Sequence, residues 1–349
     1  MGDFIRDIPD AATGEVFEVA QGLLHRFGFQ DDCSADLLIH LAQHQLLPDF
    51  TLVYFPDNDD DSHKRGPEVA LETLEHVDER LGEIFEAFGG LEAMLEECCV
   101  VLTGDHAQSD ILVDTDTAGI RLDQILADFS LAEAGKPWAG DNELVVCPNL
   151  RMAQIYFKQS GLDQLEHVVT QLLDDDRIDQ VIWRANLFGQ TEQGYHVATA
   201  DRGKLHFWPG DTGPQMAADQ QGCPWSWDGD LTAIGGQVSA GSLTFPDYPN
   251  AFERIAGGLE CQTGGQLWAT AQPGSEFCLP ETSIHAGGGS HGSLHALDSI
   301  VPLLLAGAPP GVTLPAHPRT VDVMPLCLNI LGLNPERPVG ASHVSQSDK

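Results

Sequence analysis

The chain has 349 residues, 42% of them hydrophobic, which is enough for one large α/β domain or two ordinary domains with sizeable cores. Its 53 acidic and 17 basic residues give a formal net charge of −36, and that field repels a phosphate backbone, so a nucleic-acid polymer is not an expected partner. No stretch has the length and apolarity of a membrane span, and the first residues lack the order of a signal peptide. The sequence as written is that of a cytoplasmic protein, but it leaves the localisation open, because a lost N-terminal part could have carried a signal peptide. It also leaves the oligomeric state open.

The strongest periodic pattern lies in the first third of the chain. A β-rich run, TLVYF at residues 51–55, is followed by an expected acidic loop, PDNDDDSHKRGPE at residues 56–68, and then by a long amphipathic helix. A second apolar strand, CCVVLT at residues 98–103, is followed after one glycine by Asp105 and His106. Strands that alternate with helices predict an α/β fold with a mainly parallel sheet sandwiched by helices.

The texture of the sequence changes at about residue 141. Residues 141–277 mix strands and helices with turns rich in Gly, Pro and Trp, which predicts a smaller inserted or appended α+β subdomain. Over residues 278–349 the first pattern returns, with an apolar strand at 299–306 and a closing helix that ends at Gly332. We therefore expect residues 1–140 to be the first part of a metal-binding α/β domain that residues 278–349 complete.

The acidic stretch admits two interpretations on its own. Asp57, Asp59, Asp61 and Glu68 match the ligand spacing of an EF-hand calcium loop, but Ser62 replaces the glycine that such a loop needs at its sixth position. A solvated acidic loop is the plain alternative. A third interpretation, a transition-metal site, depends on residues elsewhere in the chain.

Aspartate and histidine recur together after the predicted strands. Asp59 and His63 stand four residues apart beside the end of the first strand, and Asp105 and His106 follow the second. Ligand sites in open α/β sheets gather outside the carboxyl ends of strands, so these groups are expected to converge. The glycine-rich segment GGGSHGS adds His291. Aspartate and histidine ligands without thiolate fit zinc, with manganese or iron as competitors.

These segments together resemble the alkaline phosphatase superfamily, specifically its type I phosphodiesterase/nucleotide pyrophosphatase branch. FPDNDDDSHKRGP resembles the family's PDxxxHxxGP-type segment, VVLTGDHAQSD its strand ending in Asp-His, GSHGS with VPLLLAG its late His-Gly segment, and VDVMPLCLNILGL its closing helix. The resemblance runs in order over about residues 46–342. It implies an alkaline-phosphatase-like α/β fold and hydrolysis of small phosphate esters.

The resemblance also implies roles for single residues. Two divalent metal ions, zinc above all, would clamp the phosphoryl group while a Thr or Ser hydroxyl attacks it to give a covalent phospho-enzyme. Asp59, His63 and His291 would hold one metal ion, while Asp105 and His106 belong to the other. Three further residues join the candidates: Asp57 as a replacement for Asp59, and His285 and His295 as neighbours that orient the ligands.

The nucleophile is the largest departure from the family pattern. In relatives it lies well upstream of the first motif, together with a further Asp ligand, whereas here only about fifty residues precede that motif. Thr13 is the visible candidate, with a helix N-cap as its alternative role. We therefore expect that an N-terminal part of the protein is missing from this sequence. If the absence of the nucleophile is genuine, the chain is instead a catalytically inactive metal-binding member of the same fold.

A second chemistry competes for the glycine-rich segment. GGSHG at residues 288–292 satisfies the G-x-S-x-G pattern of α/β-hydrolases, and a serine esterase would use Ser290, Asp322 and His343 in the expected chain order. The sequence context opposes this alternative, because no predicted strand leads into Ser290 and His343 lies in a polar tail.

Overall fold

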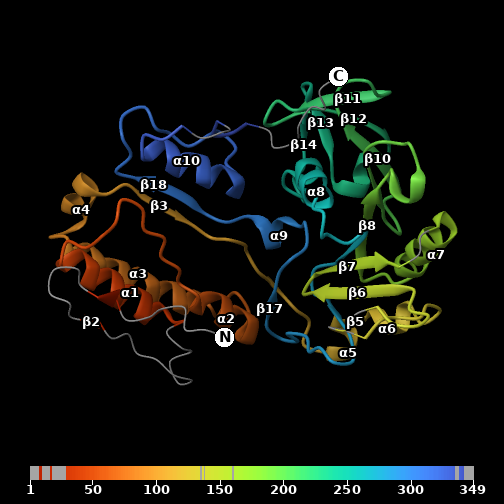
Figure 1. Ribbon diagram of the computed structural model, residues 1–349, viewed down its shortest axis with the longest axis horizontal. Helices are drawn as coiled ribbons and strands as arrows, with labels where there is room; N and C mark the ends of the chain where they lie inside the picture. The colour runs from red at the N-terminus through yellow and green to blue at the C-terminus, as the bar shows by residue number, and fades with distance from the viewer. Residues whose placement is uncertain are drawn as a thin grey trace. The chain divides into compact units, whose positions relative to one another are not determined.

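The computed structural model describes residues 8–9, 16–17, 29–133, 136, 138–158, 161–334 and 338–341, and it has a mixed α/β fold (Figure 1). The α/β class predicted from the sequence is thereby confirmed. The chain divides into two compact units, and each is described by itself. Unit 1 comprises Met1–Thr103, Pro302–Leu314 and Val321–Glu336, and unit 2 comprises Gly104–Val301, Pro315–Thr320 and Arg337–Lys349. The predicted division at residues 140 and 277 stays a prediction.

Unit 1 is mainly helical. Its longest helix, α3, has its apolar side chains on one face, and Ile84 is buried there against Ala35 of α1 and Met94 of α4. The predicted amphipathic helix is thus present. The helices and strands that the structure describes in unit 1 are β1 (Ile8–Pro9), β2 (Val16–Phe17), α1 (Asp31–Gln43), α2 (Asp57–Arg65), α3 (Leu71–Ala87), α4 (Leu91–Glu97), β3 (Val100–Thr103), β18 (Leu303–Ala306) and α10 (Val323–Ile330).

The acidic stretch is a helix, so the prediction of a loop at residues 56–68 is wrong. In α2, aspartates occupy the first turn, and His63, Lys64 and Arg65 occupy the last turn, which complements the helix dipole at both ends. Ion pairs at i,i+4 spacing join Asp60 to Lys64 at 2.6 Å and Asp61 to Arg65 at 2.7 Å. Because successive helical residues turn by about 100°, alternate aspartates point in different directions, and the calcium-loop interpretation loses its geometry.

The strands of unit 1 are short. Residues 51–55, all of which the structure describes, form no strand, so the predicted β-rich run is wrong at this point. The second predicted strand is present as β3, and it pairs antiparallel with β18, in the register Val100↔Ala306. Both strands come from sequence positions where a strand is predicted, but their antiparallel pairing does not confirm the mainly parallel sheet.

Unit 2 is built on a ten-stranded sheet, drawn mainly in green in Figure 1. All pairs between neighbouring strands are antiparallel except that of β11 with β14, so the large sheet does not confirm the predicted parallel arrangement either. The strand order is β13 (Gln237–Ser239), β14 (Ser242–Thr244), β11 (Gln215–Asp219), β12 (Pro224–Gly229), β10 (Lys204–Pro209), β9 (Tyr195–Ala198), β8 (Ile178–Arg184), β15 (Leu267–Ala271), β7 (Met152–Phe157) and β6 (Leu144–Asn149).

Unit 2 has two hydrophobic cores, and in each a helix packs against strands of the large sheet. One core joins α7 (Leu162–Leu173) to strands β6, β7, β8 and β15, and the other joins α8 (Ala251–Leu259) to strands β8, β9, β10 and β12. Neighbouring β8 residues Val181 and Ile182 belong to different cores, as the alternation of side chains along a strand requires. The other elements that the structure describes in unit 2 are β4 (Ser109–Asp110), α5 (Thr115–Ala118), β5 (Gly119–Arg121), α6 (Leu122–Ile125), β16 (Glu276–Cys278), β17 (Gly289–Ser290), α9 (Ala296–Ser299) and 3₁₀ helices at Leu187–Gly189 and Leu231–Ile234. A further 3₁₀ helix at Thr320–Asp322 spans a sequence boundary between the units.

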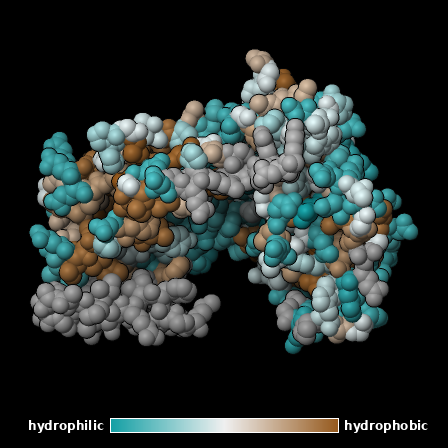
Figure 2. Space-filling view, turned by 45° about the horizontal axis from the view of Figure 1, so that its top comes forward, coloured by the Kyte–Doolittle hydropathy of each residue, from teal (hydrophilic) through white to brown (hydrophobic). Residues whose placement is uncertain are grey.

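The surface reflects the acidic composition. Figure 2 shows hydrophilic side chains over much of the visible face, with hydrophobic patches between them. Several apolar side chains of unit 1 contribute to the exposed hydrophobic surface, and Leu52 is the most open at 84% exposure. Over the residues that the structure describes, none of the helices is both long and apolar enough to cross a bilayer.

An ion pair in unit 2 between the partly exposed Arg202 and the buried Asp179 predicts a pH-dependent stability. Arg202 donates hydrogen bonds to Asp179 and to the Tyr248 hydroxyl, and Tyr248 in turn donates to Asp179 at 2.9 Å. Desolvation raises the pKa of Asp179 and the charge of Arg202 lowers it. Because the folded state binds the Asp179 proton more tightly than the unfolded state, stability falls as the pH rises through the range above the unfolded value of 3.8.

We expect Arg202→Met to lower the free energy of unfolding by about 3 kcal/mol near neutral pH, because Asp179 is left charged, buried and without its cation. As the pH falls toward 4, the variant carboxyl takes up a proton more readily, because burial raises the pKa of Asp179 and the opposing charge of Arg202 is gone, so the gap to the wild type should narrow. Thermal melts between pH 4 and pH 7 measure this gap. Arg184→Met removes an arginine that is paired with the exposed Glu260, and its effect should stay small and independent of pH. A gap for Arg202→Met that is constant over this range would contradict the prediction.

Candidate functional site

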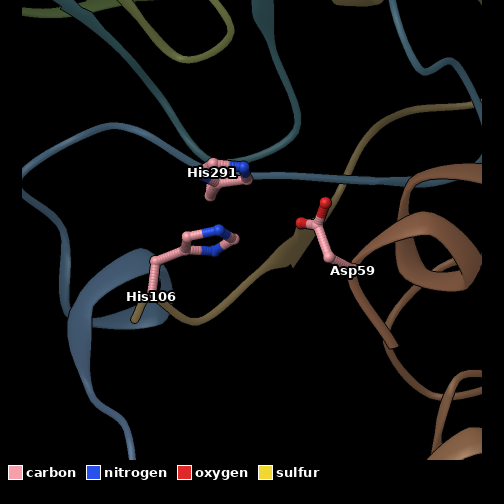
Figure 3. Close-up of side chains that lie close together, drawn as sticks. All are labelled: Asp59, His106 and His291. Carbon is pink, nitrogen blue, oxygen red and sulfur yellow. The ribbon is translucent and has the colours of Figure 1, made fainter. Parts of the chain in front are cut away.

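Two of the predicted metal ligands face each other in unit 2. His106 precedes β4 and His291 follows β17, and these two strands pair antiparallel in the register Ser290↔Ser109. The pairing brings the two histidine segments together, and their rings stack with centroids 3.5 Å apart and planes at 10° (Figure 3). Residues 185 positions apart in the sequence are thus held in contact by a two-residue ladder.

A buried ion pair anchors both histidine segments. Arg151 and Asp298 have fully buried side chains that pair directly, and the Ser109 hydroxyl lies between them, accepting from Arg151 at 2.6 Å and donating to Asp298 at 3.0 Å. The Arg151 amide donates to the His291 carbonyl at 2.9 Å, and the Ala107 amide, next to His106, donates to the Asp298 carbonyl at 3.0 Å. One charged pair therefore holds the main chain at both histidines.

Asp298 also fixes the loop after His291. Its second carboxylate oxygen accepts from the Ser293 amide at 3.0 Å and from the Ser293 hydroxyl at 2.6 Å. Sequence reasoning missed both Arg151 and Asp298. In the sequence, Asp298 lies between the late His-Gly segment and an apolar strand pattern. Its acidic side chain at that place is the only local sign of a role at the site.

Asp105 remains near the histidine pair and is open to solvent. Its side chain is 65% exposed, and one carboxylate oxygen accepts from the His106 amide at 3.0 Å. The other oxygen lies 3.7 Å from His106 Nε2. The Asp105 carboxylate and the His106 imidazole are therefore adjacent groups that present oxygen and nitrogen donors together.

In unit 1, Asp59 and His63 lie on one face of α2. Their i,i+4 spacing places His63 Nε2 3.4 Å from Asp59 Oδ1, and the Asp59 side chain is 38% exposed. The spacing that pointed to a metal site is therefore set by a helix, and not by a loop. A helical pair of this kind presents its two donors side by side.

Asp57 is engaged in a different contact. Its carboxylate accepts from the Asp31 amide and its own amide donates to the Asp31 carboxylate, both at 3.0 Å. Burial raises the pKa of Asp31 to about 6, with the neighbouring Asp57 charge adding to the rise. This reciprocal pair ties the start of α1 to the start of α2.

The other candidate residues have structural partners or fall outside the description. His285 Nδ1 lies 3.0 Å from Oε1 of the buried Glu276, and His295 Nδ1 accepts from the Leu297 amide at the start of α9. Thr13 and His343 lie outside the described residues. Ser290 is fully buried on β17 and no helix starts directly after it, which is not the strand, turn and helix of a nucleophile elbow.

The comparison with known families agrees with the sequence resemblance. A sequence model described as type I phosphodiesterase / nucleotide pyrophosphatase matches residues 15–215, which is more than half of the chain. The chain therefore belongs to this family, which is part of the alkaline phosphatase superfamily and comprises phosphodiesterase and pyrophosphatase hydrolases. A search of curated proteins found no match.

Proposed function

We propose that this member of the type I phosphodiesterase/nucleotide pyrophosphatase family is a metal-dependent hydrolase of small phosphate esters. The observation that carries the proposal is the stacked pair of His106 and His291, which the fold assembles from two distant segments and anchors on buried charges. Surface histidines need no such support. A pair held in this way presents imidazole nitrogens at a fixed place, as a metal centre requires.

The donor atoms fit the proposed metal ions. The family resemblance assigns Asp59, His63 and His291 to one proposed ion, and Asp105 and His106 to the other. All five offer carboxylate oxygen or imidazole nitrogen, which suits zinc, with manganese or iron as competitors. When bound, two such ions polarise the phosphoryl group and activate a hydroxyl nucleophile.

The charge of the protein favours a binding site that contains such cations. A chain with a net charge of −36 repels an anionic ester, and the carboxylates of Asp59 and Asp105 add to the repulsion locally. Divalent cations held by these carboxylates reverse the sign of the field where the substrate binds. The proposed nucleophile is a Thr or Ser hydroxyl. The family motif that carries it is not recognised in this sequence, and no residue is assigned to the role beyond the candidate Thr13, which lies outside the described residues.

Metal content and turnover together test the proposal. We would measure bound metal by plasma mass spectrometry and hydrolysis of bis-p-nitrophenyl phosphate, for the wild type and for His63→Ala. His167→Ala is the matched control, since His167 is an exposed histidine of α7 beside Asp128. Zinc that is lost with His63 and turnover that returns on adding zinc after chelation support the hydrolase. The same zinc without turnover supports the inactive metal-binding alternative, and equal metal content in all three proteins contradicts both.

We expect substitutions of Asp57 and Asp59 to have different effects on stability and on metal content. We expect Asp57→Ala to lower the free energy of unfolding by about 1 kcal/mol, because the Asp31 amide at the start of α1 loses its acceptor, while metal content is unchanged. Asp59→Ala should leave stability nearly unchanged and reduce bound metal. Chemical unfolding and plasma mass spectrometry on the same preparations make the comparison. Metal loss in Asp57→Ala with normal metal in Asp59→Ala would reverse the assignment.

A further inference from the structure

A row of aromatic and charged residues crosses four neighbouring strands of the unit 2 sheet. Trp183 on β8 is directly opposite His196 on β9, His196 is opposite His206 on β10, and His206 is opposite Asp228 on β12. Side chains at directly opposed positions share one face of a sheet. The rings stack along the row, with centroids 5.2 Å apart for Trp183 and His196 and 4.5 Å apart for the two histidines.

Glu192, in the connection before β9, faces both histidines. Its two carboxylate oxygens lie 3.3 Å from His196 Nε2 and 3.4 Å from His206 Nδ1. One donor atom from each of the three residues fits within a group whose atoms are all within 4.8 Å of one another. Ligands that bind zinc tetrahedrally at about 2.1 Å lie about 3.4 Å apart, which is the length of the two contacts that Glu192 makes, one from each carboxylate oxygen.

The hydrogen bonding of His206 leaves a lone pair on its Nδ1, the atom that faces Glu192. His206 Nε2 lies 2.7 Å from the Gln193 carbonyl oxygen, which can only accept, so Nε2 carries the proton. In the neutral ring Nδ1 is then an acceptor, and it faces a carboxylate that also has only lone pairs to offer. A backbone carbonyl that holds the far nitrogen of a histidine is the usual arrangement around a bound metal ion.

Protonation of both rings is unfavourable at this spacing, because two stacked imidazolium rings with centroids 4.5 Å apart would repel each other. A divalent cation meets all three lone pairs at once, and the exposure of the Glu192 side chain, 54%, leaves the group open to the solvent from which a cation would enter.

We propose that Glu192, His196 and His206 bind one divalent transition-metal ion, with zinc as the expected ion. Two imidazoles and one carboxylate match a three-ligand zinc site that keeps a fourth position for water, and copper(II) is expected to bind the same ligands more tightly. The ion would tie the connection before β9 to strands β9 and β10. None of the three residues belongs to the segments that carry the family resemblance, so the site is independent of the proposed hydrolase function.

Copper(II) titration followed by tryptophan fluorescence tests the site locally. The ring centroid of Trp183 lies 5.2 Å from that of His196, and the ring centroid of Trp208 lies 4.7 Å from that of His206. We expect saturable quenching in the wild type and at least tenfold weaker binding in Glu192→Gln and His206→Ala. Glu192→Gln replaces an exposed side chain and should fold normally. His167→Ala should behave as the wild type. Replacing both tryptophans by Phe should remove the signal.

Zinc stoichiometry by equilibrium dialysis completes the test. We expect Glu192→Gln and His206→Ala each to bind one zinc equivalent less than the wild type, also in a His291→Ala background, which separates this site from the proposed catalytic ions. The Trp to Phe variant should keep the full stoichiometry. Equal zinc binding in the wild type, Glu192→Gln and His206→Ala, or copper quenching without saturation, would overturn the proposal and leave an ion pair only.

Discussion

Replacing His106 by Phe is expected to reduce zinc affinity as much as replacing it by Ala, by at least about 100-fold. The loss of a partner that merely orients a ligand already costs 10-fold to 100-fold, and the loss of a ligand should cost more. Phenylalanine keeps an aromatic ring that can stack on His291, but it has no nitrogen. The two variants therefore separate a role in packing from a role in ligation, which the stacked geometry alone leaves combined.

The measurement is zinc affinity by competition with a chelator, together with hydrolysis of bis-p-nitrophenyl phosphate. His167→Phe is the matched control, because His167 is an exposed histidine of the same unit, on α7 beside Asp128. If His106→Phe binds zinc like the wild type while His106→Ala does not, the ring packs and does not ligate. That result would remove His106 from the proposed metal centre.

The fold could be predicted where the signal was local. Helix α3 follows from the spacing of its apolar residues, and β3 and β18 follow from short apolar runs. The helix at residues 57–65 was not predicted, because a run of aspartates usually marks a loop and its stabilisation comes from i,i+4 charge pairs. The parallel sheet was inferred from alternating strands and helices, a pattern that does not determine which strands pair.

The candidate ligands of the site could be predicted from their residue types, but the buried residues that hold them in place could not. Asp-His and His-Gly segments stand out in the sequence because their chemistry is rare, and the structure brings His106 and His291 together. Arg151 and Asp298 are separated by 147 residues and lie in no motif, so nothing local marks them as a pair. Buried charges reveal their role only through their partners, which are set by the fold.

The ion pair of Arg151 and Asp298 is expected to have a large effect on stability. Arg151→Met should lower the free energy of unfolding of unit 2 by about 3–5 kcal/mol. Asp298 would remain buried with a charge that Ser109 and Ser293 cannot neutralise. For a unit of this size such a loss should lower the melting temperature by roughly 10 °C. Differential scanning calorimetry measures the shift.

A double variant decides whether the charge or the volume of this pair matters. In Arg151→Met with Asp298→Leu both charges are absent, so much of the stability should return, as it does for other buried pairs replaced by apolar residues. Zinc binding at the proposed centre of His106 and His291 should be weaker in the double variant than in the wild type. The Ser293 amide and hydroxyl lose their acceptor there, so the loop after His291 is no longer fixed. A double variant that is as unstable as the sum of the single ones would show that the two side chains contribute separately. A double variant that is stable and binds zinc normally would show that Arg151 and Asp298 serve the fold of unit 2 and not its histidine pair.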